Sequence, residues 1–167
     1  PIRLLVFGGS QGARVMSDIV PDALTALPAE LRARFDVTQQ CRGEDLGRVR
    51  QAYANADISA KLSAFFDDMP KVIARSHLVI GRAGASTVSE LAVIGRPSIL
   101  VPLPHSLDQD QKANAEILSN AGASIMMEQD GFTPERLAET LSSLFSDGNK
   151  LSGMAAAAKA EGKPRAV

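Results

Sequence analysis

Short apolar runs alternate along the chain with segments in which apolar residues recur every three or four positions. The first pattern is typical of strands buried on both faces of a parallel sheet, and the second is typical of helices that pack on one side. Strands are predicted at residues 2–7, 35–40, 58–66, 78–80, 98–101 and 124–127. Helices are predicted from the first strand to residue 27, through 46–53, from 70 to 75, at 87–94, 109–121 and 134–145, and from 151 onward.

Proline, glycine and acidic residues mark the ends of several of these elements. Pro21 falls inside the first helical pattern, where it kinks or restarts the helix, and Pro28 ends the helix. Asp67 is expected to cap the short helix that has Pro70 in its first turn, and Gly95 closes a later helix. The regular alternation predicts an α/β fold, a doubly wound parallel six-stranded sheet, whose ligands bind at the carboxyl ends of the strands.

Length and charge limit the possible functions. The 167 residues suit one domain, which we place at residues 1–160 and follow with a tail at 161–167. With 18 basic and 19 acidic residues, the formal net charge of −1 gives no footprint for nucleic acid, so an anionic ligand must be bound by local groups. The single cysteine, Cys41, has no disulfide partner or metal-ligand neighbours, which predicts a plain thiol at a strand end and a reducing compartment.

The beginning of the chain suggests a piece of a larger protein. Pro1 lies one step before a predicted core strand, as expected at a cut or processed boundary, and no signal-peptide layout follows it. No apolar run approaches the roughly 20 residues that cross a bilayer. We therefore expect a soluble domain taken from a longer chain.

Two glycine-rich stretches carry most of the functional information. Residues 8–12 (Gly-Gly-Ser-Gln-Gly) follow the first strand, and residues 81–90 (Gly-Arg-Ala-Gly-Ala-Ser-Thr-Val-Ser-Glu) follow the fourth. Backbone N–H groups at such strand-to-helix junctions bind anions without a catalytic side chain. The first stretch has neither the G-x-G-x-x-G spacing nor a Walker lysine, so alone it fits a tight structural turn as well as a diphosphate site.

The second stretch adds a carboxylate. Glu90 lies one turn into the predicted helix, where an ionised carboxylate can accept two hydrogen bonds from a ribose diol. The presence of Glu90 is explained equally well by the helix dipole, which favours an acidic residue in the first turn. Ser86, Thr87 and Ser89 are also explained as ordinary helix-capping residues.

Two further segments are less specific. The polar segment 102–115 contains amides and carboxylates that suit sugar hydroxyls but also suit a solvated helix start. Phe65 and Phe66 are able to pack on a flat base, although such pairs more often belong to a core. We assign no role to His105, and His77 fits a structural position at the start of a strand.

In this order, the motifs resemble the carboxyl-terminal, donor-binding domain of the MurG-type peptidoglycan N-acetylglucosaminyltransferases, glycosyltransferase family 28 with the GT-B architecture. The matching segments are residues 8–12, 66–69, Arg82 with 84–90, and 110–111 with 114–115. The resemblance implies a Rossmann-like half that binds UDP-N-acetylglucosamine at an inter-domain cleft. The substrate-binding residues that it implies are Ser10, Gln11, Gly12, Phe66, Arg82, Gly84, Ala85, Ser86, Thr87, Val88, Ser89, Glu90, Asp110 and Gln111.

The resemblance also implies individual roles. Ser10 would contact the diphosphate, the backbone of Phe66 the uracil edge, and residues 85–87 the diphosphate and uridine. Glu90 would take the ribose hydroxyls, and Gln111 those of the sugar. The family commonly has His-Gln or Gln-Gln where this chain has Asp110-Gln111, and the preceding loop is one residue longer than in some members, so the sugar contacts rest on a weaker match.

The amino-terminal half of such a transferase is absent from this chain, and with it the acceptor site and the catalytic base. The resemblance therefore implies no catalytic residue, cofactor or metal here, although Asp108-Gln109-Asp110 looks like an Asp-x-Asp triad. In the parent protein it implies transfer to lipid I, giving lipid II with inversion, by a cytoplasmic enzyme peripheral on the inner face of the bacterial inner membrane. This chain alone should bind the donor without turnover.

Two alternatives remain open from the sequence. One is the donor domain of another GT-B transferase, such as a eukaryotic-type catalytic chain with a separate membrane partner or a galactolipid synthase. The other is a non-catalytic module that binds nucleotide sugars, because a fold alone does not fix a function.

Overall fold

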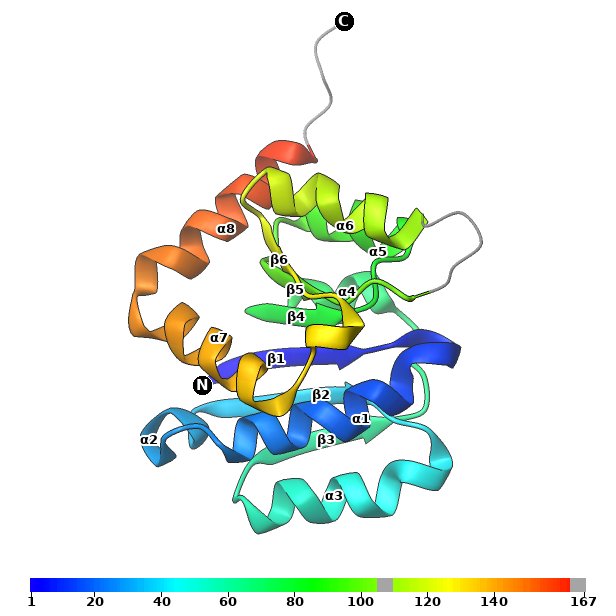
Figure 1. Ribbon diagram of the computed structural model, residues 1–167, viewed down its shortest axis with the longest axis vertical. Helices are drawn as coiled ribbons and strands as arrows, with labels where there is room; N and C mark the ends of the chain where they lie inside the picture. The colour runs from blue at the N-terminus through cyan, green and yellow to red at the C-terminus, as the bar shows by residue number, and fades with distance from the viewer. Residues whose placement is uncertain (105–109, 163–167) are drawn as a thin grey trace, which may run out of the picture.

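Six strands form one parallel sheet in the computed structural model, which describes residues 1–104 and 110–162 (Figure 1). The strands are β1 (Ile2–Phe7), β2 (Phe35–Gln40), β3 (Ser59–Ser63), β4 (Leu78–Gly81), β5 (Ser98–Leu100) and β6 (Ser124–Met126). Their order across the sheet is β3-β2-β1-β4-β5-β6, and every neighbouring pair is parallel. The predicted doubly wound parallel sheet is confirmed.

Helices cover both faces of this sheet. They are α1 (Gly9–Thr25), α2 (Ala29–Arg32), α3 (Leu46–Asn55), α4 (Met69–Ala74), α5 (Ala85–Ile94), α6 (Asp110–Asn120), α7 (Pro134–Ser146) and α8 (Gly148–Glu161), with 3₁₀ turns at Gly43–Asp45 and Gln129–Gly131. One apolar core joins α1, α3 and α7 to the sheet, and a second joins α4, α5 and α6; α8 contributes to both. This is the three-layer arrangement expected of an α/β domain.

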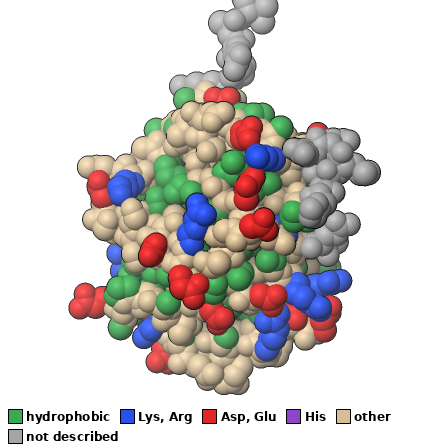
Figure 2. Space-filling model, in the orientation of Figure 1, with side chains coloured by type: hydrophobic (Ala, Val, Ile, Leu, Met, Phe, Trp, Pro, Cys, Tyr) green, Lys and Arg blue, Asp and Glu red, His purple; other side chains and the backbone are tan. Residues whose placement is uncertain are grey.

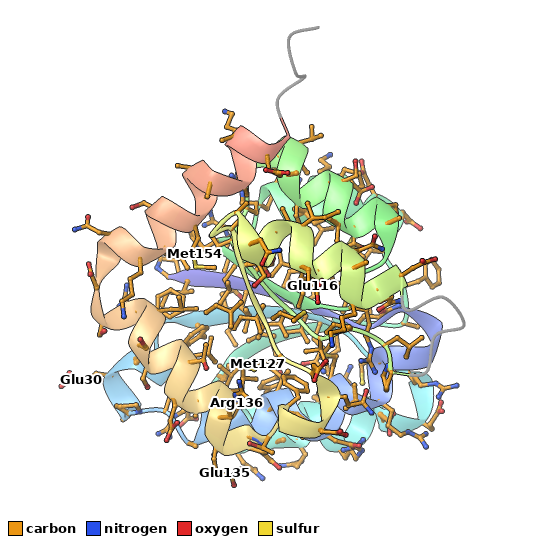
Figure 3. All side chains as sticks on the ribbon, turned by 45° about the horizontal axis from the view of Figure 1, so that its top comes forward. Glu30, Glu116, Met127, Glu135, Arg136 and Met154 are labelled. Atoms are coloured by element: carbon orange, nitrogen blue, oxygen red, sulfur yellow. The ribbon has the colours of Figure 1, made fainter. Side chains whose placement is uncertain are left out.

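Helix α7 shows how the sequence pattern becomes packing. Leu137, Leu141 and Leu144 recur at helical spacing and are buried, whereas Glu135 points away from the body of the molecule (Figure 3). The helix begins where the Thr133 hydroxyl accepts a backbone N–H at 3.2 Å. Such a cap satisfies one of the amide groups that a helix start leaves without a partner.

Two predicted boundaries were wrong around the third strand. The strand covers only residues 59–63 instead of 58–66, and beyond it the Ser63 hydroxyl donates to the Phe65 carbonyl at 2.6 Å, which holds the chain in a bend. The cap of α4 is Asp68, whose carboxylate accepts from the Lys71 N–H at 3.1 Å, and not Asp67. The cap therefore lies one residue later than predicted, although the helix itself begins one residue earlier, at Met69.

Other differences are small. Helix α1 continues through Pro21 to Thr25, whose hydroxyl donates to the Pro21 carbonyl at 2.8 Å. Helices α5 and α8 begin two and three residues earlier than predicted. Helix α2 and the 3₁₀ turns were not predicted because elements of three or four residues are too short to show a period.

The topology also fixes where a ligand belongs. The strand order changes direction between β1 and β4, and in such sheets ligands bind outside the carboxyl ends of the strands at that point. Acidic and basic side chains are interspersed over the face shown in Figure 2, consistent with the small net charge.

Candidate functional site

The two glycine-rich stretches lie side by side at the carboxyl ends of neighbouring strands. Phe7 and Gly81, the last residues of β1 and β4, are register partners. A side chain on Gly8 would overlap the backbone of α1, and Gly9 has φ of +68°, so both positions favour glycine. The sheet thus brings together two segments that are separated by 68 residues, 13–80, in the chain.

Arg82 connects the two stretches and is almost completely buried, with 6% of its surface exposed. Its guanidinium donates to the carbonyls of Val101 and Pro102, each at 3.2 Å, and to Gln129 Oε1 at 2.7 Å. All three acceptors are neutral, and Arg82 Nε has no hydrogen-bond partner among the described residues. Burial lowers the pKa of this side chain from its usual value, so its charge is held in an unfavourable environment.

Gly12 makes room for this arginine. A Cβ at this position would lie 2.5 Å from Arg82 Nε and 2.9 Å from its Cγ. The guanidinium therefore packs directly on the first turns of α1. The glycine at the end of the first stretch is explained by contact with the arginine of the second.

An open pocket of about 230 Å³ lies between these elements. It is lined by Phe7, Gly8, Gly9, Arg82, Gly84, Thr87, Leu103 and Gln111. Helices α1 and α5 both begin at its wall; their N-cap residues are glycines, which have no side chain to cap the helix, and neither first turn holds an acidic residue. Two helix N-termini and a buried guanidinium make this pocket positive, which suits a diphosphate.

Two side-chain amides of α6 hold the loop between β4 and α5. Gln111 Oε1 accepts from the N–H groups of Ala83 and Leu103 at 3.2 and 2.9 Å, and Asn114 Nδ2 donates to the Ala83 carbonyl at 3.0 Å. Because only an oxygen can accept from two N–H groups, the orientation of the Gln111 amide is determined. Its NH₂ group remains as the part that can meet a ligand, and only as a donor.

The other predicted residues of the second stretch surround this pocket without all lining it. Ala85 and Ser89 line a neighbouring hollow between α5 and α6, Ser86 is exposed, and the side chain of Val88 is 8% exposed and packs in the core. Val88 can therefore meet a ligand mainly through its backbone.

Glu90 follows Thr87 by three residues, a spacing that places two side chains on one helix face. It is half-buried and has no ion pair within residues 1–104 and 110–162. Asp110, at the start of α6, is exposed.

The two phenylalanines separate. Phe66 is half-buried and packs against the second core, whereas 69% of Phe65 is exposed. Both line a groove of about 310 Å³ beside β3 and α4. Phe66 therefore takes a core position, and Phe65 does not.

Sequence reasoning missed Gln40 and Gln129. Gln129 accepts from Arg82, and Gln40 Oε1 accepts from the N–H groups of Gly8 and Gly9 at 3.1 and 2.8 Å. A signal for Gln40 existed, because it is a polar residue at the carboxyl end of the strand next to β1. Gln129 lies in a short turn with no such signal.

Some predictions fall outside what the structure describes. These are the side chains of Ser10 and Gln11 and all of residues 105–109, which include His105 and most of the Asp-x-Asp segment. In the described ranges, no three His, Cys, Asp or Glu side chains gather in a way that could hold a metal ion. Across the same ranges, no helix has the length and apolar character needed to cross a membrane.

Comparison with solved structures defines the class. The chain superposes on MurG of Acinetobacter baumannii with a TM-score of 0.87 and 32% identity, over 98% of this chain and 48% of that one. WaaG, a glycosyltransferase involved in lipopolysaccharide biosynthesis, matches with a TM-score of 0.75 at 17% identity, over 96% of this chain and 42% of that one, and supports the fold alone. The fold is that of the Rossmann-like half of a GT-B glycosyltransferase.

Sequence comparison gives the family. The model of the glycosyltransferase family 28 C-terminal domain matches residues 3–167, and the chain belongs to this family. A relative from Methylobacterium nodulans, named UDP-N-acetylglucosamine--N-acetylmuramyl-(pentapeptide) pyrophosphoryl-undecaprenol N-acetylglucosamine transferase, is 58% identical over the whole chain. One of the same name from Rhodopseudomonas palustris is 56% identical over 98% of the chain. The chain spans 45% and 44% of the length of these relatives.

Proposed function

We propose that this chain is the donor-binding half of an N-acetylglucosaminyltransferase and that it binds UDP-N-acetylglucosamine at the carboxyl ends of β1 and β4. The observation that carries the proposal is the buried charge of Arg82, which has no ion pair within residues 1–104 and 110–162, beside the N-termini of α1 and α5. None of the described residues that line the pocket is acidic, and a diphosphate supplies the negative charge that suits it. The relatives of more than 50% identity carry the name of such a transferase.

The pocket has a direct chemical use. When the bond between the anomeric carbon and the UDP oxygen breaks, negative charge grows on the leaving diphosphate. Arg82 and the N-termini of α1 and α5 stabilise that charge, and they are fixed before the reaction begins. The donor half thus orients the sugar and stabilises the leaving group, while the nucleophile arrives from the other side.

The remaining contacts of the proposal are those that the family resemblance implies. The Glu90 carboxylate accepts from the ribose diol, the backbone of Phe66 meets the uracil, and the segment from Ala85 to Thr87 lies along the uridine diphosphate. Since the oxygen of Gln111 is already occupied by two N–H groups, Gln111 donates to a sugar oxygen. The exposed Asp110 carboxylate at the same helix start is available to accept a hydroxyl proton.

The complete protein would transfer N-acetylglucosamine to the muramyl sugar of lipid I, giving lipid II with inversion. An amino-terminal half would bring the acceptor and the catalytic base, and residues 1–160 form the donor domain. The complete enzyme would be cytoplasmic and peripheral on the inner face of the bacterial inner membrane. The support for these statements is the name of the relatives and the share of their length that this chain spans.

Calorimetric titration with UDP-N-acetylglucosamine, UDP-galactose and UDP-glucose tests the proposal. Preference for the first supports it, preference for another points to a different GT-B transferase, and no binding of any UDP sugar contradicts it. Glu90→Gln should weaken binding of all three by about 1.5–3 kcal/mol, the range for a hydrogen bond to a charged group. Glu139→Gln, at an exposed position of α7, is the matched control; equal affinities of the two variants would remove Glu90 from the ribose site.

A further inference from the structure

Gln40 is the last residue of β2, and its side chain reaches two separate segments of the candidate donor site. Its Oε1 accepts from the Gly8 and Gly9 N–H groups at 3.1 and 2.8 Å, and its Nε2 donates to the Ala64 carbonyl at 3.3 Å. Two N–H donors require an oxygen, so the amide cannot be turned the other way. One half-buried side chain therefore joins the glycine turn after β1 to the bend after β3.

These bonds restrict how the glycine turn can be used. The N–H groups of Gly8 and Gly9 already have an acceptor, so they are poorly placed to bind phosphate unless Gln40 moves. The anion must then rely on the later amides of the first turn of α1, on the start of α5 and on Arg82. Gln40 therefore fixes the conformation of the glycine turn, and other groups bind the anion.

The bend after β3 is held a second time, independently of Gln40. The Ser63 hydroxyl donates to the Phe65 carbonyl at 2.6 Å. Removing this bond would loosen the bend but leave the glycine turn tied to Gln40. Variants of Gln40 and Ser63 therefore form a matched pair, because the Gln40 side chain contacts both segments and the Ser63 side chain contacts the bend alone.

We propose that Gln40 is a positioning residue that sets the spacing between the diphosphate end and the base end of the donor site. This rests on the proposed function, in which the base meets the backbone of Phe66 and the diphosphate lies beside Gly9. A ligand that spans both ends needs the two segments at one fixed separation, whereas a ligand that uses one end does not. Gln40 thus contributes to affinity only for ligands that contain both parts.

Binding of UDP and of uridine to the 167-residue chain separates the two roles. Gln40→Met keeps the length of the side chain and removes both polar atoms; it should weaken UDP binding roughly tenfold and uridine binding less than about threefold. Ser63→Ala should weaken both ligands by the same factor, within about twofold. Equal factors for the two ligands in Gln40→Met, or no change in either, would overturn the coupling role.

A measurement without ligand keeps this inference separate from the proposed function. In the ¹⁵N-labelled chain, Gln40→Met should accelerate amide exchange at Gly8 and Gly9 and also shift the Phe65 amide, whose peptide unit includes the Ala64 carbonyl. Ser63→Ala should shift Phe65 and leave exchange at Gly9 unchanged. If wild type binds no UDP, the proposed function fails; if exchange at Gly9 is the same in Gln40→Met and wild type, the positioning role fails whatever the ligand.

Discussion

Replacement of Arg82 by methionine tests whether this buried charge serves a ligand or the fold. The change removes three hydrogen bonds to neutral acceptors, at 2.7 to 3.2 Å, and bonds from a charged donor contribute about 1.5–3 kcal/mol each. It also removes a buried charge whose desolvation costs several kcal/mol. Because the two effects oppose each other, we expect the free energy of unfolding without ligand to change by less than about 2 kcal/mol.

The effect on binding should be much larger. A guanidinium about 4 Å from a phosphate contributes up to about 4 kcal/mol at an effective dielectric constant near 20, and solvent in the open pocket reduces this. A loss of about 2–4 kcal/mol corresponds to a roughly 30- to 700-fold weaker affinity for UDP. Arg82→Lys keeps the charge but not the planar fork, so its loss should lie between those of wild type and Arg82→Met.

Titration calorimetry with UDP measures the affinities, and urea unfolding measures the stability of each variant without ligand. Arg50→Met removes an arginine from an exposed position of α3 and should leave both quantities unchanged. If Arg82→Met binds UDP within threefold of wild type, or if Arg82→Lys is as weak as Arg82→Met, the charge of Arg82 does not bind the diphosphate. A large loss of stability with unchanged affinity would make Arg82 a purely structural link.

The remaining predictions concern the scaffold and its pH dependence. Gly95 ends α5 with φ of +82°, and a Cβ there would lie 2.9 Å from that of Lys159, so Gly95→Ala should lower the free energy of unfolding by about 1–2 kcal/mol. Gly153→Ala, within α8 and facing open space, should instead raise it by about 0.5–1 kcal/mol; urea unfolding measures both, and equal signs would contradict the reasoning.

Burial, with the charges of Arg3 and Arg96, lowers the pKa of His77, whose Nδ1 accepts from the Arg3 N–H at 2.9 Å. The unfolded chain therefore binds more protons, so the stability that His77 contributes is present above pH about 6.5 and lost as pH falls toward its folded pKa. His77→Asn should flatten the slope of stability as pH falls below about 6.5, and an unchanged slope would assign it to other groups.

Much of the sheet could be predicted from the sequence because β1, β4 and β5 are short apolar runs with no competing helical period. The carboxyl ends of β1 and β4 could likewise be chosen as a ligand site, since glycine at both junctions and the usual order of doubly wound sheets point there. The end of β3 at Ser63 and the cap of α4 at Asp68 could not be predicted in this way. The residues after Ser63 are apolar enough to suggest a longer strand, but a hydroxyl-to-carbonyl hydrogen bond holds them in a bend. The sequence pattern also does not decide which of the two adjacent aspartates caps α4.

The amides around the site illustrate a second limit. Gln40 meets residues 32 positions earlier in the chain, and Gln129 meets an arginine 47 positions earlier. Such contacts depend on side-chain directions in elements that periodicity places only approximately. The sequence identifies Gln111 as a candidate ligand contact. It does not show that two loop N–H groups occupy the side-chain oxygen, so that only the NH₂ group can bind a ligand; this depends on the three-dimensional fold.

The energetics of Arg82 favour a role in ligand binding over a purely structural role. Its three acceptors are neutral, so an uncharged donor of similar reach would satisfy them without burying a charge. The arginine instead adds a desolvated charge and a buried Nε with no partner among the described residues, beside two helix ends that repel cations. All of these costs are reduced when an anion occupies the pocket. We therefore expect bound UDP to raise the stability of wild type more than that of Arg82→Met at equal UDP concentration, as mass action requires if the charge serves the ligand.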